Sequence, residues 1–348
     1  MKVAILGCGA VAKAHIEPLK RLDVEVVAVC DPDEEASAGV AARFGIPRRY
    51  REAAELLDRE RPDVVHVIAP PQAHRDLAVE AMEAGCHVLV EKPMAVNAAE
   101  ADEMIEAARR CDRTLGVCHT MLFDPGVMRA RELAASGELG EVVAVETRIN
   151  FHQPEAERTA STGWIRELRG GVINEIGPHP VYLHREFLGD VTVFSALSKA
   201  VDTASPVVEF RAILEGESGT GGVALSFAAR PRQNVMRVYG TRMGVYVDIL
   251  NHLVVRMGRD TVGGNLSRTL VNLDLGARLA TRAVTATASG LRRPWLRGHD
   301  NLIQAHYAAL RDGADPPVTG EDGRAVVAVL DQLWERLEAS EPVSAPSR

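Results

Sequence analysis

The stretch Val3-Ala4-Ile5-Leu6-Gly7-Cys8-Gly9-Ala10-Val11-Ala12, near the start of the 348-residue chain, decides the expected fold. Its apolar run predicts a buried strand, and the GxGxxA pattern that follows is typical of a tight turn leading into a helix. Gly7 permits the turn, Gly9 permits close approach of a ligand to the backbone, and Ala12 is small enough for close helix–strand packing. The stretch therefore predicts the opening of a doubly wound α/β domain.

The rest of residues 1–121 repeats this alternation of strand and helix. Apolar runs without polar alternation are typical of strands covered on both faces, and their alternation with helices predicts a parallel sheet. We therefore expect a Rossmann domain at 1–121. The apolar runs lie at 3–6, 24–30, 64–69, 87–90 and 115–118, and the helical patterns at 11–21, 34–43, 51–59, 74–84 and 97–110.

After residue 121 the pattern changes to short strands joined by turns, which predicts a mostly antiparallel sheet. We expect an α+β domain at 122–348 with an open sheet that binds substrate and supports a homodimer or homotetramer. The tail at 340–348 is expected to be disordered. For the helix at 266–288, a packed or subunit-contact surface is favoured over a membrane surface. Candidate strands lie at 141–149, 191–199, 207–214, 222–228, 233–239, 243–249 and 252–257, and helices at 125–136, 174–188, 266–288, 299–312 and 321–338.

Composition excludes several classes of protein. A net charge of −8 and a pI near 5.8 argue against a general nucleic-acid binder, which needs a basic surface. No signal-peptide pattern and no bilayer-spanning apolar stretch occurs. The five cysteines form no CxxC pair and no Cys/His cluster, so neither a disulfide scaffold nor a metal site is expected. We expect a cytoplasmic protein with free thiols and no nucleic-acid or membrane partner.

An acid at the end of the second expected strand supports a dinucleotide site. Asp31 lies 24 residues after Gly7, near the usual place of a ribose-binding carboxylate. Such a carboxylate accepts hydrogen bonds from ribose hydroxyls and repels a 2′-phosphate, and no Lys or Arg occurs in Asp31–Glu35. NAD is therefore favoured over NADP, and a ligand-free strand-turn-helix is the disfavoured alternative. The expected contacts are Gly7, Gly9, Ala10, Val11, Ala12 and Asp31.

Polar residues also follow two further expected strands. Ala69-Pro70-Pro71 and His74 follow the third apolar run, and Glu91-Lys92-Pro93 follows the fourth. Because the carboxyl ends of parallel strands face the ligand crevice, we expect Lys92 to point toward the nicotinamide. A solvated surface charge is the usual explanation for a lysine, but it fits poorly between an acid and a proline at a strand end.

These motifs together resemble the Gfo/Idh/MocA family, which includes glucose–fructose oxidoreductase and inositol dehydrogenase. The resemblance covers nearly the whole chain, and Glu91-Lys92-Pro93 is its most specific part. It implies a dehydrogenase that moves hydride between NAD and a secondary alcohol or ketone of a sugar, inositol or sugar derivative. It also extends the expected cofactor contacts to Ala69, Pro70, Pro71, His74, Glu91 and Lys92.

A second family motif, GG-x-x-x-D-x-G-x-H, resembles Gly170–His179 here. His179 matches the catalytic histidine, Glu175 stands where Asp is usual, and Tyr182 stands where a second Asp often follows. The resemblance implies that Lys92, His179 and Glu175 are catalytic. From the residues alone, a helix-start acid and a buried, satisfied histidine remain alternatives. We also expect four residues to line the substrate pocket, namely His119, Trp164, Arg166 and Tyr182.

Alcohol oxidation needs a base for the hydroxyl proton, and we expect Lys92 in that role when desolvation disfavours its charged form. His179 would hydrogen-bond the reacting oxygen and relay the proton, with Glu175 fixing its tautomer. One alternative is a redox-neutral enzyme that retains NAD, such as a glycosidase or an epimerase. The other is a non-catalytic NAD- or sugar-sensing regulator, which the presence of both Lys92 and His179 disfavours.

Overall fold

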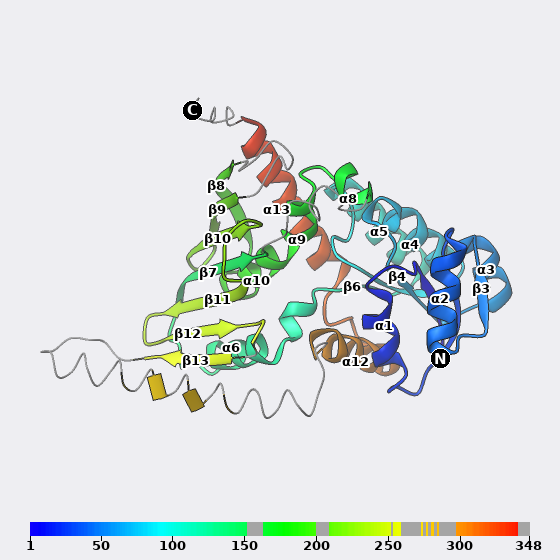
Figure 1. The fold of residues 1–348 in the computed structure, drawn as a ribbon, viewed down its shortest axis with the longest axis horizontal. Helices are drawn as coiled ribbons and strands as arrows, with labels where there is room; N and C mark the ends of the chain where they lie inside the picture. The colour runs from blue at the N-terminus through cyan, green and yellow to red at the C-terminus, as the bar shows by residue number, and fades with distance from the viewer. Residues whose placement is uncertain are drawn as a thin grey trace, which may run out of the picture. The chain divides into compact units, whose positions relative to one another are not determined.

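A computed structural model describes residues 1–151, 163–199, 209–251, 253–258 and 297–339, with isolated positions between 273 and 284 (Figure 1). The tail expected to be disordered at 340–348 lies outside the described residues, as does most of the helix expected at 266–288. The chain divides into two compact units. The first comprises Met1–Thr120 and Gly298–Ala328, and the second comprises Met121–Arg297 and Val329–Arg348.

The first unit contains a six-stranded parallel sheet in the order β3-β2-β1-β4-β5-β6. Strand β4 is buried along its whole length, as expected for a strand covered on both faces. The order reverses between β1 and β4, which confirms the doubly wound Rossmann fold. Its strands are β1 (Lys2–Leu6), β2 (Glu25–Cys30), β3 (Arg48–Tyr50), β4 (Val64–Val67), β5 (His87–Val90) and β6 (Leu115–Val117).

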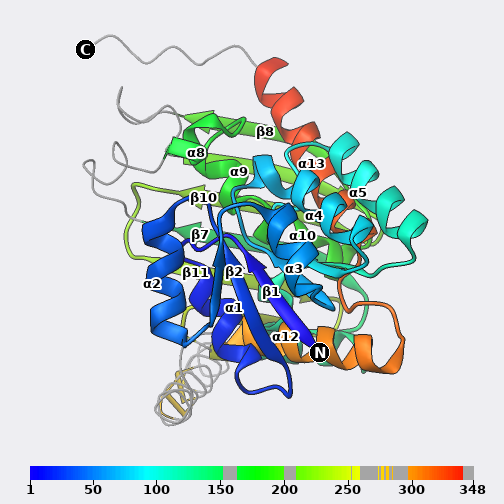
Figure 2. The same cartoon turned by 90° about the vertical axis from the view of Figure 1, so that its right-hand side faces the viewer.

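Helices connect these strands, and Figure 2 gives a view of them around the sheet. Asp33 begins α2 by accepting hydrogen bonds from the backbone N–H groups of Glu35 and Ala36, and Asn97 begins α5 in the same way. Helix α1, which follows the glycine turn, begins without a side-chain cap. The helices are α1 (Ala12–Leu19), α2 (Glu34–Phe44), α3 (Ala53–Glu60), α4 (His74–Glu83) and α5 (Ala98–Cys111), with a 3-10 turn η1 (Pro71–Ala73) before α4.

Helix α12 (Arg297–Asp312) and the first part of α13 (Gly320–Ala339) group with the first unit, although the predicted boundary placed them in the second. Their packing explains the difference. The Tyr307 hydroxyl lies 3.0 Å from Nε2 of His66 in β4, and Thr319 forms a β-bridge with Gly116 in β6. The prediction followed chain order, which gives no sign of such a return. Its first boundary lies beside the observed one, between Thr120 and Met121.

The second unit contains a seven-stranded sheet in the order β13-β12-β11-β7-β10-β9-β8. Strands β7 and β10 pair in parallel and every other pair is antiparallel, which confirms the expected mostly antiparallel sheet. The strands are β7 (Val142–Asn150), β8 (Val191–Lys199), β9 (Glu209–Gly216), β10 (Thr220–Ser226), β11 (Gln233–Gly240), β12 (Gly244–Asp248) and β13 (Leu253–Met257). Its helices include α6 (Pro125–Ala135), α8 (Gly163–Glu167), α9 (Val172–Ile176) and α10 (Pro178–Leu188), after a 3-10 turn η2 (Thr120–Phe123) at the junction of the units.

The single helix predicted at 174–188 is divided at Gly177 into α9 and α10. Pro178 and Pro180 follow at once, and a proline has no backbone N–H to continue the helical hydrogen-bond ladder. None of the helices in the described part of the chain has the length and apolarity needed to cross a bilayer.

Helix α10 packs on one face of the second sheet (Figure 1). His184 of α10 is fully buried, and its Nε2 lies 3.1 Å from the carbonyl oxygen of Val145 in β7. Gly221 of β10 leaves room for this ring, because a Cβ atom there would overlap the His184 side chain. The neighbouring Gly222 points to the other face, where a Cβ atom would meet only Cγ of Glu146, at 3.7 Å.

These two glycines give a matched stability test. We expect Gly221→Ala to lower the free energy of unfolding by about 1–3 kcal/mol, because an added methyl group overpacks the helix–sheet contact. Gly222→Ala should change it by less than about 0.5 kcal/mol. Urea denaturation of both variants measures the difference. Equal free energies of unfolding for the two variants would show that the added methyl group at residue 221 does not overpack the contact with His184.

Candidate active site

The glycine turn after β1 comes very close to the loop after β4. Gly7 has φ +106°, and a Cβ atom there would lie 2.7 Å from the backbone N of Ala69, so both conformation and space require glycine. At Gly9 a Cβ atom would meet no heavy atom within 4 Å. Residues 9–11 are exposed and lead into a helix without a side-chain cap. This arrangement fits a pyrophosphate, which binds at helix amino termini.

Asp31 ties the end of β2 to this turn. Its Oδ2 accepts a hydrogen bond from the Cys8 N–H at 2.7 Å, and its Oδ1 accepts one from the Asp33 N–H at 2.9 Å. The carboxylate is thus oriented by the backbone beside the glycine turn, where a ribose-binding acid is expected. The nearby cation Arg51 forms an ion pair with Glu34, with a 2.6 Å separation between Nη1 and Oε1.

Cys8 lies inside the glycine turn but does not have the properties of a nucleophile. Burial, followed by the negative charge of Asp31, raises the pKa of its thiol to about 12. A cysteine acts as a nucleophile through its thiolate, so this side chain stays inert near neutral pH.

Lys92 follows β5 and is anchored through the residues on both sides of it. Oε2 of the buried Glu91 accepts a hydrogen bond from the Lys92 backbone N–H at 3.0 Å. On the other side, Nδ1 of His74 lies 3.0 Å from the carbonyl oxygen of Pro93, and its Nε2 lies 2.8 Å from that of Ala69. The His74 ring therefore lies between the loops after β4 and β5, where its single N–H donates to one of the two carbonyls. Lys92 is the partly exposed residue between two buried ones.

His74 and Glu91 were predicted as cofactor contacts, together with Ala69, Pro70 and Pro71. The His74 ring is fully buried against backbone carbonyls, and the Glu91 side chain is turned inward. Pro70 is exposed in the same loop, and Ala69 is half-buried. Their contacts with a cofactor remain predictions.

Glu91, the residue before Lys92, contacts a set of buried polar side chains that the sequence interpretation missed. Nε2 of His15 lies 3.0 Å from Oε1 of Glu91, and its Nδ1 lies 2.9 Å from Nδ1 of His66. Nε2 of His66 lies 3.0 Å from the Tyr307 hydroxyl. The available signal was His66 itself, since a histidine inside the apolar run Val64–Ile68 must find a polar partner in the core.

Glu91 remains ionised in this interior. Burial by itself raises the pKa of the Glu91 carboxyl, but hydrogen bonds from His15 and His299 outweigh burial and hold it well below its ordinary value. Desolvation lowers the pKa of His15, and it lowers that of His66 further, so both rings are neutral. A negative charge therefore lies directly beside Lys92 in the chain.

In the second unit, Tyr182 orients His179. The Tyr182 hydroxyl accepts a hydrogen bond from the Met121 N–H at 3.1 Å and lies 2.6 Å from Nδ1 of His179. The Tyr182 hydroxyl therefore occupies the Nδ1 side of the His179 ring and holds the ring in one orientation. The expected role of Glu175, to fix the His179 tautomer, remains a prediction.

The other predicted residues are placed as follows. Glu175 is half-buried on α9. His179 is buried on α10, one helical turn before Tyr182 in the same helix. Trp164 on α8 is half-buried. The side chain of Arg166 lies outside the described residues. His119 is buried at the end of the first unit, after β6.

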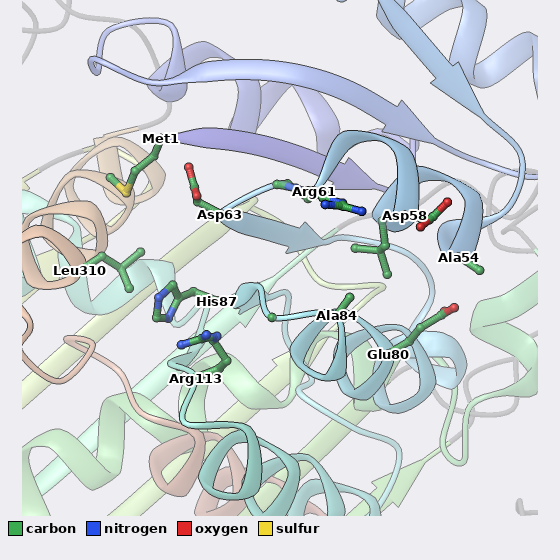
Figure 3. Close-up of a pocket in the computed structure, with 13 residues that line it drawn as sticks. Met1, Ala54, Asp58, Arg61, Asp63, Glu80, Ala84, His87, Arg113 and Leu310 are labelled. Atoms are coloured by element: carbon green, nitrogen blue, oxygen red, sulfur yellow. The ribbon is translucent and has the colours of Figure 1, made fainter.

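A cavity of about 970 Å³ lies elsewhere in the first unit, beside residues that precede its strands (Figure 3). Asp63 precedes β4, His87 begins β5 and Arg113 precedes β6, so the cavity is at the amino edge of the sheet. The glycine turn, Asp31 and Lys92 all follow their strands, at the carboxyl edge. This hollow is therefore distinct from the predicted nucleotide site.

Comparison with known proteins matches both halves of the chain to family models. Residues 1–119 match the "Oxidoreductase family, NAD-binding Rossmann fold" model. Residues 127–246 match the "GFO/IDH/MocA C-terminal domain" model.

Individual relatives cover nearly the whole chain. D-apiose dehydrogenase from Paraburkholderia graminis is 28% identical over 342 residues, which are 96% of this chain and 86% of the relative. D-xylose 1-dehydrogenase (NADP(+)) 2 from Haloferax volcanii is 27% identical over 346 residues, or 99% of each protein. The crystal structure of the WlbA dehydrogenase from Bordetella pertussis, in complex with NADH and UDP-GlcNAcA, shares the fold with a TM-score of 0.80 at 19% identity, covering 97% of this chain and 96% of that one.

The glycine turn, the acid after β2 and the lysine after β5 occur on the fold that the resemblance implied, and both family models match in order along the chain. This chain belongs to the Gfo/Idh/MocA family of oxidoreductases, whose amino-terminal domain is an NAD-binding Rossmann fold.

Proposed function

We propose that this protein is an NAD-dependent dehydrogenase that acts on a secondary alcohol or ketone of a sugar, inositol or sugar derivative. Lys92 exchanges the hydroxyl proton, assisted by His179. The observation that carries the proposal is the anchoring of Lys92 at the carboxyl end of β5. Glu91 accepts a hydrogen bond from its backbone N–H, and the His74 ring lies against the carbonyl of Pro93, so the backbone is held while the lysine side chain is partly exposed.

The cofactor contacts in this proposal are the glycine turn and Asp31. The turn offers backbone N–H groups at a helix amino terminus to the pyrophosphate, and the Asp31 carboxylate accepts hydrogen bonds from the ribose hydroxyls. When bound there, NAD supplies the acceptor for the hydride that leaves the carbinol carbon. The protein's own residues bind, orient and exchange the proton.

Two side chains divide the proton chemistry. Lys92 removes the hydroxyl proton in its neutral amine form and returns a proton in the reverse reaction. His179 donates a hydrogen bond from Nε2 to the substrate oxygen, because Tyr182 occupies its Nδ1. Glu175 is a proposed member of the same catalytic set, and Trp164, Arg166, His119 and Tyr182 are proposed to line the substrate pocket.

We also propose that NAD is preferred to NADP. Asp31 has both carboxylate oxygens oriented by the backbone, and a 2′-phosphate beside them would be repelled. The nearby Arg51 is already paired with Glu34.

A homodimer or homotetramer completes the proposal. The face of the second sheet opposite α10 exposes large apolar side chains on adjacent strands. Phe194 and Leu197 of β8 are 66% and 52% exposed, and Ile213 of β9 is 50% exposed. A second copy of the chain would bury this apolar surface and gain the corresponding hydrophobic free energy.

The lysine assignment is tested by Lys92→Met. We expect kcat to fall by about 10²–10⁴-fold, because the proton carrier is lost, while the Kd for NAD changes by less than about twofold. The assay is NADH absorbance with a panel of aldoses, inositols and nucleotide sugars. Lys20→Met, at the exposed residue directly after α1, is the matched control and should keep wild-type turnover. Undiminished turnover in Lys92→Met would reject the lysine as the proton carrier.

The histidine assignment is tested by comparing His179→Gln with His179→Ala. The glutamine amide can replace the Nε2–H donor, whereas alanine cannot. We expect kcat to fall by about tenfold in His179→Gln and by at least about a hundredfold in His179→Ala. Equal losses in the two variants would mean that the hydrogen bond from Nε2 is not what His179 contributes.

The cofactor preference is tested by Asp31→Ala. We expect the Kd for NAD to rise at least about tenfold, since two charge-assisted hydrogen bonds to the ribose are lost. The Kd for NADP should rise less, because repulsion of the 2′-phosphate is relieved. Calorimetric titration gives both constants. Glu35→Gln removes a nearby charge as the control, and the ribose role of Asp31 fails if both cofactors lose affinity equally.

A further inference from the structure

Four side chains from different elements of the first unit form a continuous hydrogen-bonded series. It begins at Tyr307 of α12, passes through His66 of β4 and His15 of α1, and ends at Glu91 after β5. The successive separations are 3.0, 2.9 and 3.0 Å. Tyr307, His66 and His15 are fully buried, and Glu91 is 7% exposed.

The donors and acceptors in this series can be ordered from one end. An ionised carboxylate only accepts, so Nε2 of His15 must carry the proton that it donates to Glu91. A neutral His15 then has an unprotonated Nδ1, which accepts from Nδ1–H of His66. Nε2 of His66 is consequently unprotonated and accepts from the Tyr307 hydroxyl. All three hydrogen bonds point toward Glu91, and both histidine tautomers are determined.

We propose that Tyr307, His66 and His15 are positioning residues that act through Glu91 to keep a fixed negative charge beside Lys92. This proposal rests on the proposed function, in which Lys92 exchanges the substrate proton. None of the three touches substrate or cofactor in it. Their effect is to keep the proton of His15 on Nε2, so that His15 always donates its hydrogen bond to Glu91.

The groups that face Glu91 come from each element packed around it. His15 approaches from α1, and His299 at the start of α12 places Nε2 3.6 Å from Oε1 of Glu91. Cys118 follows β6, and its sulfur lies close to the side chains of both His15 and Glu91. The sulfur, a ring nitrogen of His15 and a carboxylate oxygen of Glu91 all lie within 4.8 Å of one another. Besides burial, the charge of Glu91 raises the pKa of the Cys118 thiol, and the charge of Lys92 lowers it. The charge of Glu91 also acts on the pKa of His74 in α4. The charges of Glu91 and Lys92 are therefore both close to Cys118.

The protonation states of the series agree with this order. Desolvation raises the pKa of the Tyr307 hydroxyl well above its ordinary value, so it remains a donor. Desolvation lowers the pKa of His66 well below its ordinary value, and the neighbouring rings of His15 and His306 lower it further. Near neutral pH the series therefore carries one charge, on Glu91.

His15, Glu91 and Cys118 are also side chains of the types that bind zinc. In the proposed series these side chains are joined by hydrogen bonds rather than by a metal. Nε2 of His15 is the donor to Glu91, and burial, followed by the Glu91 charge, raises the pKa of the Cys118 thiol well above its ordinary value. A metal site would need the opposite state of both groups, an unprotonated Nε2 and a thiolate.

A fixed charge on Glu91 has a consequence for the pH dependence of turnover. A carboxylate charge next to a proton-accepting amine moves the pH range in which such an amine is neutral to higher pH, and oxidation of the alcohol needs a neutral amine. Without the donated hydrogen bond from His15, Glu91 would take up a proton in this low-dielectric interior and lose its charge. The acid limb of the kcat/KM profile for oxidation would then move to lower pH.

The experiment compares two substitutions of His66. Leucine removes the donor to His15, whereas the asparagine amide can replace Nδ1–H. We expect His66→Leu to move the acid limb to lower pH by about one unit, in the same direction as Glu91→Gln. We expect His66→Asn to restore the wild-type limb. The double variant His66→Leu/Glu91→Gln should match Glu91→Gln alone, because the series acts only through that carboxylate.

His306→Leu is the matched control. His306 lies beside Tyr307, is 1% exposed, and has no hydrogen-bond partner for either ring nitrogen within the described structure. It should leave the pH profile in place. A purely structural role for His66 would lower the melting temperature and kcat without moving the limb, and that result would overturn the proposal.

A measurement on the unmodified protein decides the same point if the His66 variants do not fold. Nitrogen NMR of protein with isotopically labelled histidine should show His15 as the neutral Nε2–H tautomer and His66 as the neutral Nδ1–H tautomer near neutral pH. Reversed tautomers, a cationic ring or a stoichiometric bound zinc would overturn the series. If Lys92→Met retains full turnover, the proposed function fails, and the NMR result still tests the tautomers separately.

Discussion

The first unit depends on one buried carboxylate. Removing a charge from water costs several kcal/mol unless hydrogen bonds replace those that water made, so the Glu91 side chain requires donors from the protein. They come from His15 on α1 and from the backbone N–H of Lys92, and His299 at the start of α12 lies 3.6 Å from the same carboxylate. Helix α12 groups with the parallel sheet although it follows the second unit in the chain. The helix brings His299 to the carboxylate and Tyr307 to the buried histidines.

Most of the fold could be predicted because hydrophobic patterning reports directly on burial. The apolar runs gave five of the six strands of the parallel sheet, and the strand patterns after residue 121 correspond to β7–β13. Strand β3, Arg48–Tyr50, was missed because an exposed edge strand has no apolar run. The return of α12 was missed because amphipathic periodicity shows that a helix packs, but not against which sheet. The division at Gly177 was missed because the helical pattern was given more weight than the two prolines that follow.

From the residues alone, the candidate site was predictable only where its residues follow strands, whereas His179 and Glu175 were expected only through the family resemblance. Gly7, Asp31 and Lys92 follow β1, β2 and β5, and parallel sheets place such positions along one edge. His15, His66 and Tyr307 occupy the interiors of elements, and their partners are distant in sequence, 241 residues apart for His66 and Tyr307. No spacing rule connects such residues. A polar side chain within an apolar strand indicates that a partner exists, but only the packed structure identifies it.

The buried histidines make the stability of the fold, rather than the charge of the site, sensitive to pH. Desolvation lowers the pKa of His15, His66, His74 and His184, and it lowers that of His306 to about 4. In the unfolded chain these rings titrate near 6.5, so below that pH the unfolded state binds more protons and is favoured. Glu91 adds to the effect in the same direction, because its pKa is also lower in the folded state and its contribution is lost at still lower pH. The folded state, with the hydrogen bonds that hold the Glu91 charge next to Lys92, is therefore most stable at neutral pH and above. Alcohol oxidation by a neutral amine is also favoured in that pH range.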